Sequence, residues 1–500
     1  MQSVILRKLR GLPAAVDNSL LARKFSVFLA WLYRLAENSA LLSPLFRTTK
    51  LTTLSNNSAL RHAMTKIADV TVFLGRFVGE SFRQSKLATP LVWLLNRPGY
   101  VVGMMLLGFV SVPNDMWNNA YNTILAGLLL TFALLRAIVL SKPFIKKGVL
   151  PLSLVVFMAI VLLSQLLSQD FSLTLRFFIF YVTAFMFTIA ILSLIDNAQA
   201  LKQTVTLWLI GIFFTGLYGV WQNISGAVKI DPTLTDMAVS GDMPGRIYAT
   251  FGNANNYAEL LLLTLPLFIG MMLIVKKFPA KLAFFLMLLP PVASMFLTGS
   301  RSAWVSVLFS IVLFVLLTKP KWLPYLIVAG LCAIPLLPGY FINRFLSLFG
   351  GNDSSSRYRQ TIFRTVSPLT KSVWFEGVGV GPQIFTETTL NFPIYTINVM
   401  PHVHRTIYQV LLEFGVFGCL SIILTVFGSF AMAIRRIFAF LKTPYGILLA
   451  AFLSSLAGLT LMSIGEHVWF YPRMMACFFI SLALMLSLIH MDPAEMNEEL

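Results

Sequence analysis

The sequence predicts an all-α polytopic membrane protein with about twelve transmembrane helices and a large extracytoplasmic loop. Of its 500 residues, 57% are hydrophobic and only 12% are charged, and the mean hydropathy is +0.79. Water alone cannot solvate such a chain. Apolar runs of roughly 18 to 25 residues, long enough to cross about 30 Å of hydrocarbon, recur from Tyr100 to the C-terminus.

The N-terminal region, residues 1–99, holds fourteen Lys and Arg against four Asp and Glu. Apolar residues recur at helical spacing from Ile67 to Phe82, with Arg76 among them. The pattern predicts an amphipathic helix on the inner membrane surface, with a partly disordered basic tail as the alternative. More than half of the net charge of +18 lies here, so an anionic leaflet is a simpler partner than nucleic acid.

The transmembrane domain is predicted over residues 100–490 and is followed by a short acidic cytoplasmic tail, 491–500. Pro113 cuts its first span short, which makes that span the weakest. The predicted spans are 100–113, 119–140, 149–168, 175–195, 203–225, 255–275, 282–299, 303–318, 322–340, 406–433, 445–464 and 474–490.

The orientation follows from the loops, because short cytoplasmic loops collect Lys and Arg. Both termini are predicted in the cytoplasm, and loops 226–254 and 341–405 on the outside. The cationic residues that this orientation places inside are Lys142, Lys146, Lys147, Lys202, Lys276, Lys277, Lys281, Lys319, Lys321, Arg435, Arg436 and Lys442.

Two arginines stand out on the predicted outer face. Arg246 lies in a Gly- and Asn-rich stretch just before a span, and Arg301 lies in a very short turn between two spans. A guanidinium near a helix start suits phosphate oxygens, and a cation outside runs against the positive-inside trend. The two are candidate ligands for a pyrophosphate; the alternative is that each is an arginine anchored at the membrane interface.

The large outer loop carries Arg357 in a Ser-rich stretch predicted to open a short helix, then a Gly-Val-Gly-Val-Gly turn at 377–381. No strand precedes this turn and no βαβ element follows it, which excludes a dinucleotide-binding fold. The glycines instead predict a close approach of backbone to another segment or to a substrate.

The same loop closes on His402 and His404, two of only five histidines, just before an apolar span. A neutral imidazole accepts a proton near neutral pH, so His404 is the candidate general base. Glu413 lies further on and is expected to pack or hydrogen-bond within the helix. The outer turn with Glu466, His467 and Arg473 is a candidate part of a sugar site, or an aromatic interface belt.

No metal or other cofactor is predicted. Asp231, Asp236 and Asp242 have an irregular spacing that resembles no metal-ligand pattern. The three cysteines, Cys332, Cys419 and Cys477, all fall within predicted spans and are expected to pack there.

The order of these pieces resembles the O-antigen ligase and O-antigen polymerase superfamily over roughly residues 120–490. The matching features are R-x(4)-F-G-N-x-N-N from Arg246, G-S-R-S-A-W around Arg301, a long outer loop with Arg357 and the glycine turn, and His404 before L-L-E-F-G-V-F-G. The resemblance does not extend to residues 1–99.

The resemblance implies an inverting, metal-independent glycosyltransferase at the outer face of a bacterial cytoplasmic membrane. It would move a glycan from a polyprenyl (undecaprenyl) pyrophosphate to an acceptor hydroxyl, in O-antigen, capsule or exopolysaccharide biosynthesis. Arg246 and Arg301 match the family's pyrophosphate-binding arginines and His404 its proposed base. Arg405 replaces the Asn that commonly follows that histidine and is a candidate third phosphate contact, and His402 is expected to orient the base or to bind sugar.

A membrane transporter or a flippase of lipid-linked oligosaccharides is the competing class. Twelve spans with both ends inside suit it equally well, but the apolar runs lack paired inverted repeats and contain few acidic residues for ion coupling. The sequence does not separate a polymerase from a ligase, and no residue identifies the sugar, the acceptor, the oligomeric state or a protein partner.

Overall fold

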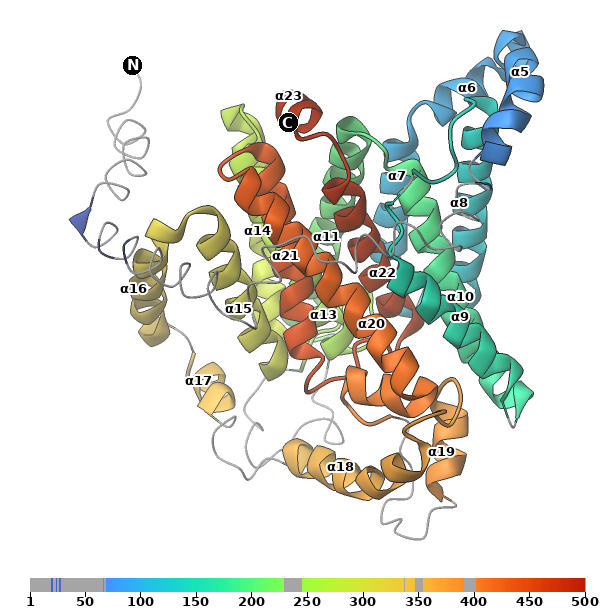
Figure 1. The fold of residues 1–500 in the computed structure, drawn as a ribbon. Helices are drawn as coiled ribbons and strands as arrows, with labels where there is room; N and C mark the ends of the chain where they lie inside the picture. Colours follow the sequence, from blue (N-terminus) through green and yellow to red (C-terminus); the bar gives the residue numbers. More distant parts are fainter. Residues whose placement is uncertain are drawn as a thin grey trace, which may run out of the picture.

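The computed structural model describes residues 69–146, 148–168, 170–228, 245–336, 338–346, 354–390 and 402–499, with a few isolated positions before residue 69. Every regular element in these residues is a helix (Figure 1). The all-α membrane fold that the hydropathy predicts is therefore confirmed.

Nine helices in the described part of the chain are long and apolar enough to cross a membrane. The other three predicted spans correspond to shorter helices: α7 (Pro98–Ser111), which is bent by 66° from the short helix before it, α9 (Leu152–Leu166) and α16 (Leu323–Ala333). The count of twelve spans therefore stays a prediction. The nine are α8 (Asn119–Val139), α10 (Phe171–Leu194), α11 (Ala198–Ile224), α13 (Ala254–Ile274), α14 (Phe278–Leu297), α15 (Arg301–Thr318), α20 (Thr406–Ala439), α21 (Pro444–Met462) and α22 (Pro472–Ile489).

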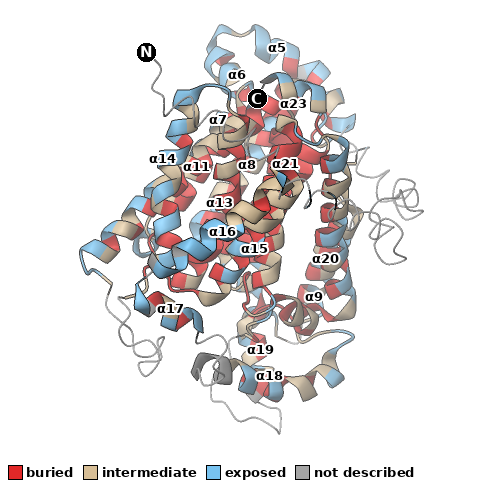
Figure 2. Cartoon of the chain, turned by 90° about the vertical axis from the view of Figure 1, so that its left-hand side faces the viewer, coloured by how far each residue is buried: buried red, intermediate tan, exposed pale blue. Residues whose placement is uncertain are grey.

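The centre of the bundle is formed by α13, α21 and α22, whose residues are almost all buried. Around them, α10 packs against α22, α15 against α21, and α11 against both α7 and α14. The outer helices expose apolar side chains such as Leu286 and Leu308. Figure 2 shows stretches of exposed residues along α14 and α16. Burial of apolar faces inside and exposure of apolar faces outside is the arrangement expected of a bundle surrounded by lipid.

The two ends of the bundle differ. At one end lie α5 (Glu80–Gln84), α6 (Thr89–Leu95) and α23 (Pro493–Glu499), and at the other lie α18 (Ser354–Val373) and α19 (Pro382–Leu390), with α17 (Gly339–Leu346) toward that end (Figure 1). The predicted outer loop 341–405 is thus partly folded into helices that cover one end of the bundle.

The glycine turn at 377–381 crosses α20 where that helix is broken. Gly415 has φ 67° and ψ −172° inside α20, so the helix changes direction there. Val378 N–H donates to Leu412 O at 2.7 Å, and Gly379 N–H donates to Glu413 O at 3.2 Å. A Cβ on Gly377 would lie 2.5 Å from Glu413 O, and the residue has φ 80°. The close backbone approach that the glycines predict is therefore present.

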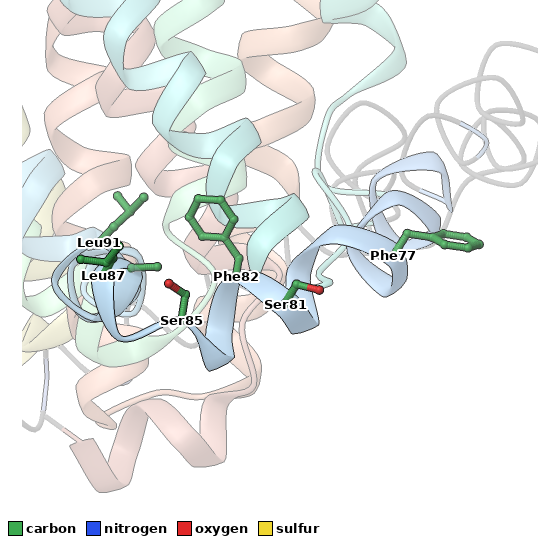
Figure 3. A pocket seen from close by; sticks show the side chains of 7 residues that line it. Phe77, Ser81, Phe82, Ser85, Leu87 and Leu91 are labelled. Atoms are coloured by element: carbon green, nitrogen blue, oxygen red, sulfur yellow. The ribbon is translucent and has the colours of Figure 1, made fainter.

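The part of the N-terminal region that is described is helical from residue 69 to 84, with a π-helical turn at Gly75–Gly79. Phe77 is 69% exposed, and Phe73 and Leu87 also face outward. An open groove of about 580 Å³ lies where α5 joins α6, lined by Phe77, Ser81, Phe82, Ser85, Leu87, Ala88 and Leu91 (Figure 3). The greater part of residues 1–68 lies outside the described residues, so a disordered tail is not tested there.

Candidate functional site

Arg246 is held against the short turn that joins α14 to α15. Its Nε donates to Thr298 O at 2.8 Å, and the next residue, Ile247, donates its N–H to Leu297 O at 3.3 Å. Arg301 is the first residue of α15, and Ser300 precedes it as the N-cap residue. The structure therefore brings the two predicted pyrophosphate ligands to one turn, although they are 55 positions apart in the chain.

Asn255 links Arg246 to a second part of the site. Asn253 caps α13 by accepting from Asn255 N at 2.8 Å, which fixes the first turn of that helix. The side chain of Asn255 then accepts from Arg246 Nη2 at 2.6 Å through Oδ1. Its Nδ2 lies 3.4 Å from Glu466 Oε1. The Asn-rich sequence after Arg246 thus serves as both a helix cap and a bridge.

Arg344 joins the same turn, which the sequence did not predict. It lies on α17, is 6% exposed, and donates through Nε to Gly299 O at 2.9 Å. Arg246 and Arg344 therefore donate to consecutive carbonyls, those of Thr298 and Gly299, and only Ser300 separates these residues from Arg301. Little in the sequence indicated that Arg344 belongs to the site, because a lone arginine in a short amphipathic segment usually faces solvent.

Burial and the neighbouring arginines lower the pKa of Arg246. Burial, followed by the positive charge of Arg344, lowers the pKa of Arg246 to about 10, and Arg301 and Arg359 act in the same direction while Glu466 opposes them. Like charges disfavour each other's charged forms, so the turn is a strongly electropositive place. An anion bound there would relieve the repulsion.

Glu466 is the carboxylate at the centre of the site. It lies in the turn between α21 and α22, is 6% exposed, and forms an ion pair through Oε1 with Arg359 of α18. Its Oε2 lies 3.5 Å from His404 Nδ1. Burial alone would raise its pKa, but Arg359 and the hydrogen bond to His404 hold the pKa of this carboxyl below its ordinary value. Arg359 is a further residue that the sequence did not single out.

His404 is held in a strained backbone conformation next to Glu466. Its φ is 56°, in the left-handed region that a non-glycine residue rarely adopts. Its N–H donates to His402 Nδ1 at 3.1 Å, and the two rings lie 4.1 Å apart. Strain of this kind persists only where the surroundings fix it, and it is common at functional sites. Thr406, which donates through Oγ1 to Glu466 O at 3.1 Å, helps to hold the segment.

His402 and His467 are neutral partners of this arrangement. Burial and then the neighbouring His404 and His467 hold the pKa of His402 well below its ordinary value. Burial likewise lowers the pKa of His467 to about 3. Because His402 Nδ1 accepts the His404 N–H, that nitrogen is not available to take a proton from a substrate. His402 also packs on Phe470, with ring centroids 4.4 Å apart.

The other candidates are placed differently. Arg405 is exposed and lies with its guanidinium carbon 4.2 Å from the ring centroid of Phe363, the geometry of a cation–π contact. Arg357 lies in α18, but its side chain is outside the described residues, as are Asp231, Asp236 and Asp242.

Arg473 does not join the site. It is buried, and its guanidinium donates to Phe109 O, to Thr250 O at 2.9 Å and to Val112 O at 2.9 Å. These hydrogen bonds tie the end of α7 to the loop before α13. Glu413 accepts from Gln409 Nε2 at 2.9 Å and from Tyr181 OH at 3.3 Å, which is the hydrogen-bonding role that the sequence predicts for it.

Comparison with known proteins agrees with this picture. Residues 282–423 match the family described as O-antigen ligase, and this segment contains Arg301, Arg344, Arg359 and His404. The chain is also 22% identical over 278 residues to the teichuronic acid biosynthesis protein TuaE of Bacillus subtilis (strain 168). That match covers 52% of this chain and 56% of the length of the relative.

The matched segment and the distant relative support the same superfamily as the order of the sequence motifs. Arg246 and Glu466 lie outside the matched residues and reach the site through the fold. Residues 282–423 of the chain are thus similar to the O-antigen ligase family, and the longer match is to a relative in teichuronic acid biosynthesis.

Proposed function

We propose that this protein is a glycosyltransferase of bacterial polysaccharide biosynthesis, which transfers a glycan from a polyprenyl pyrophosphate to an acceptor hydroxyl. The observation that carries the proposal is one chain of contacts. It runs from Arg246 through Asn255 to Glu466, and from Glu466 to His404. The side chains of Asn255 and Glu466 thus connect the guanidinium group of Arg246 to the imidazole of His404.

Arg246 and Arg301 supply the charge that the leaving group needs. A pyrophosphate departs from the anomeric carbon with negative charge building on its oxygens, and charged donors already in place stabilise it. The turn at 298–301 presents these donors at the start of α15, where the helix N-terminus also favours an anion.

His404 acts as the general base on the acceptor hydroxyl. With the hydrogen on Nδ1, facing Glu466 Oε2, the lone pair lies on Nε2. When Nε2 takes the proton of the hydroxyl, the resulting imidazolium is stabilised by the Glu466 carboxylate. A base in this position typically contributes about 10²–10⁴-fold in rate. His402 is expected to orient this segment or to contact sugar.

Attack by the hydroxyl on the face opposite the departing pyrophosphate inverts the anomeric centre. The guanidinium groups provide the charge stabilisation for which many such enzymes use a metal ion, so we propose a metal-independent, inverting reaction. Candidate contacts to donor or acceptor are His467, buried beside His402, and the exposed Arg405. For Arg357 the proposal rests on the family resemblance.

We place the reaction at the outer face of the bacterial cytoplasmic membrane, with both termini inside. Supporting this orientation, α18, which carries Arg359, covers the end of the bundle opposite to α23 (Figure 1). We further propose that the N-terminal region lies on the anionic inner leaflet. The exposed apolar residues Phe73, Phe77 and Leu87 would enter it and Arg76 and Lys86 would meet its headgroups.

Purified protein in lipid nanodiscs, incubated with a lipid-linked repeat unit, tests the proposal. Chain growth from the repeat unit alone indicates a polymerase; transfer only after a separate acceptor is added indicates a ligase. The variant His404→Ala is expected to abolish both while protein level and membrane insertion stay normal. Flipping of the repeat unit across liposomes without any glycan transfer would support the transporter class instead.

A further inference from the structure

Arg405 is an exposed arginine that directly follows His404, the proposed base. It is the N-cap residue of α20 and has an extended backbone, with φ −147° and ψ 110°. Gln409 holds this backbone at two points: its Oε1 accepts from Val403 N at 2.9 Å, and its N–H donates to Arg405 O at 2.9 Å. The exposed side chain therefore projects from a backbone that is fixed beside the base.

The guanidinium of Arg405 lies on an aromatic ring instead of a carboxylate. Its central carbon is 4.2 Å from the ring centroid of Phe363, and Phe363 packs on Tyr408 with centroids 5.3 Å apart. Within the ranges that the structure describes, no carboxylate forms an ion pair with Arg405. Arg359, by contrast, is paired with Glu466. A guanidinium stacked on a ring keeps its N–H edge open, and that edge matches the two oxygens of a carboxylate.

Arg405 lies apart from the contacts that connect the base to the proposed donor site. Arg246 is joined to the Nδ1 side of His404 through Asn255 and Glu466. Arg405 takes no part in this chain of contacts, and the acceptor hydroxyl is proposed at the other ring nitrogen, Nε2. Consecutive Cα atoms are about 3.8 Å apart, so a hydroxyl at the imidazole and an anionic group at the guanidinium can belong to one sugar residue.

The charge around Arg405 favours an anionic partner. The helix α18, which carries Phe363, contains three arginines and one lysine and no Asp or Glu. Arg364 and Lys371 of this helix are exposed. The predicted outer loop, residues 341–405, holds six Lys and Arg against three Asp and Glu. An excess of cations on an outer loop is the reverse of the positive-inside trend, and it attracts anionic ligands to this face.

We propose that Arg405 binds a carboxylate of the acceptor glycan, so that the enzyme selects an acceptor whose reacting sugar is a uronic acid or carries another carboxyl group. A carboxylate has one charge and two coplanar oxygens, which a single stacked guanidinium binds side by side. The inference rests on the proposed function, because it names the substrate class of the same reaction. Arg405 is then a residue that determines specificity, and His404 remains the base.

The test compares two forms of one acceptor, using the full-length protein in nanodiscs and saturating lipid-linked donor. The acceptor is the repeat-unit glycan of the bacterium that produces the protein, freed of its carrier and fluorescently labelled so that only transfer to it is counted. One sample is intact, and in the other the carboxyl groups are reduced to primary alcohols. The wild type is expected to show a KM about tenfold higher for the reduced acceptor, with a similar kcat.

Arg405→Gln should lose this preference. Its KM for the intact acceptor should rise about tenfold, as is typical for loss of a hydrogen bond to a charged group, while its KM for the reduced acceptor stays near that of wild type. Lys371→Gln removes another exposed cation of α18 and is the matched control, which should behave as wild type. If Arg405→Gln has a lowered melting temperature, Arg405→Lys replaces it. This variant keeps the charge but loses the fork, so its preference should be several-fold smaller than that of wild type.

The outcomes separate this inference from the proposed function. If the wild type transfers no glycan from a lipid pyrophosphate, the proposed function fails. If it transfers glycan to an acceptor without a carboxyl group, or if both Arg405 variants keep the wild-type preference, the role of Arg405 is wrong while the proposed function stands. A rise in the KM for the donor alone, or an effect seen only in nanodiscs that contain phosphatidylglycerol, would place Arg405 on a phosphate of the donor or of the membrane. Either result would overturn the inference.

Discussion

Replacement of Glu466 by Gln is the sharpest test of the catalytic arrangement. The change keeps the shape of the side chain and removes its negative charge. It therefore removes the attraction between the Glu466 carboxylate and the imidazolium that forms when His404 accepts a proton. The carboxylate is 6% exposed, so solvent screens it little.

The separation of His404 Nδ1 and Glu466 Oε2, 3.5 Å, sets the scale of the effect. Two unit charges at that distance attract by about 5 kcal/mol at an effective dielectric constant of about 20, and by about 1 kcal/mol in water. The charges of the imidazolium and the carboxylate are spread over several atoms, so we expect roughly half of the 5 kcal/mol that holds at a dielectric constant of about 20. Since about 1.4 kcal/mol corresponds to tenfold in rate, Glu466→Gln should lower kcat by about 10²-fold.

The assay is the initial rate of glycan transfer in nanodiscs at saturating lipid-linked donor. Glu376→Gln, an exposed carboxylate before the glycine turn, is the matched control. Arg359→Gln shows whether the loss comes from the missing ion pair or from the missing carboxylate charge. This variant removes the Arg359–Glu466 ion pair but leaves the charge of Glu466 beside His404. A wild-type kcat in Glu466→Gln, or an equal loss in both variants with the same pH–rate profile, would refute the assigned role of Glu466.

Further predictions follow from the same contacts. Arg246→Ala and Arg301→Ala should weaken binding of the lipid-linked donor, and Lys should restore it only in part; unchanged donor affinity would remove them from the site. Arg473→Ala should lower the melting temperature by several degrees, because it leaves buried carbonyls unpaired, while the donor affinity of the folded fraction stays normal. The pKa of Glu466 in the folded protein is below its unfolded value near 4.5. The wild type should therefore have a larger free energy of unfolding than Glu466→Gln above about pH 4.5, and this difference should disappear as the pH falls through the folded pKa. A difference that grows on acidification would contradict the prediction. Cysteines placed at positions 246, 301 and 404 should react with an impermeant thiol reagent from outside, and labelling only from inside would reverse the proposed orientation.

The sequence predicted the helices well because the hydrocarbon solvent imposes a strong and simple pattern. Each of the twelve predicted segments contains a helix, and the ends mostly agree within a few residues. The break at Gly415 was not predicted, because a single glycine inside an apolar run is common in membrane helices. Its cause is tertiary: the segment at 374–379 takes the hydrogen bonds that a straight α20 would have made for itself.

The site was predictable only where residues departed from a trend. Arg246 and Arg301 stood out because a cation close to a span on the predicted outer face runs against the positive-inside trend, and His404 because the chain has only five histidines. Arg344 and Arg359 carry the same chemistry but gave no such signal, because Arg359 follows a Ser-rich polar stretch and Arg344 is a lone arginine in a short, mostly apolar segment. Arg473 shows the opposite case. It looked like a substrate contact beside aromatics, and its contacts with the carbonyls of Phe109 and Thr250 come from segments more than 200 positions away.

The broken helix α20 has a consequence for depth in the bilayer. A straight helix of 34 residues would be about 51 Å long, far more than the roughly 30 Å of a hydrocarbon core. The part after Gly415 alone is about 36 Å long and fills that thickness. The nine residues before the break would otherwise carry His404 about 14 Å further along the helix axis. By turning them aside, the break at Gly415 shortens the apolar span toward the hydrocarbon thickness, and in the proposed orientation it would keep the His404 imidazole near the lipid headgroups.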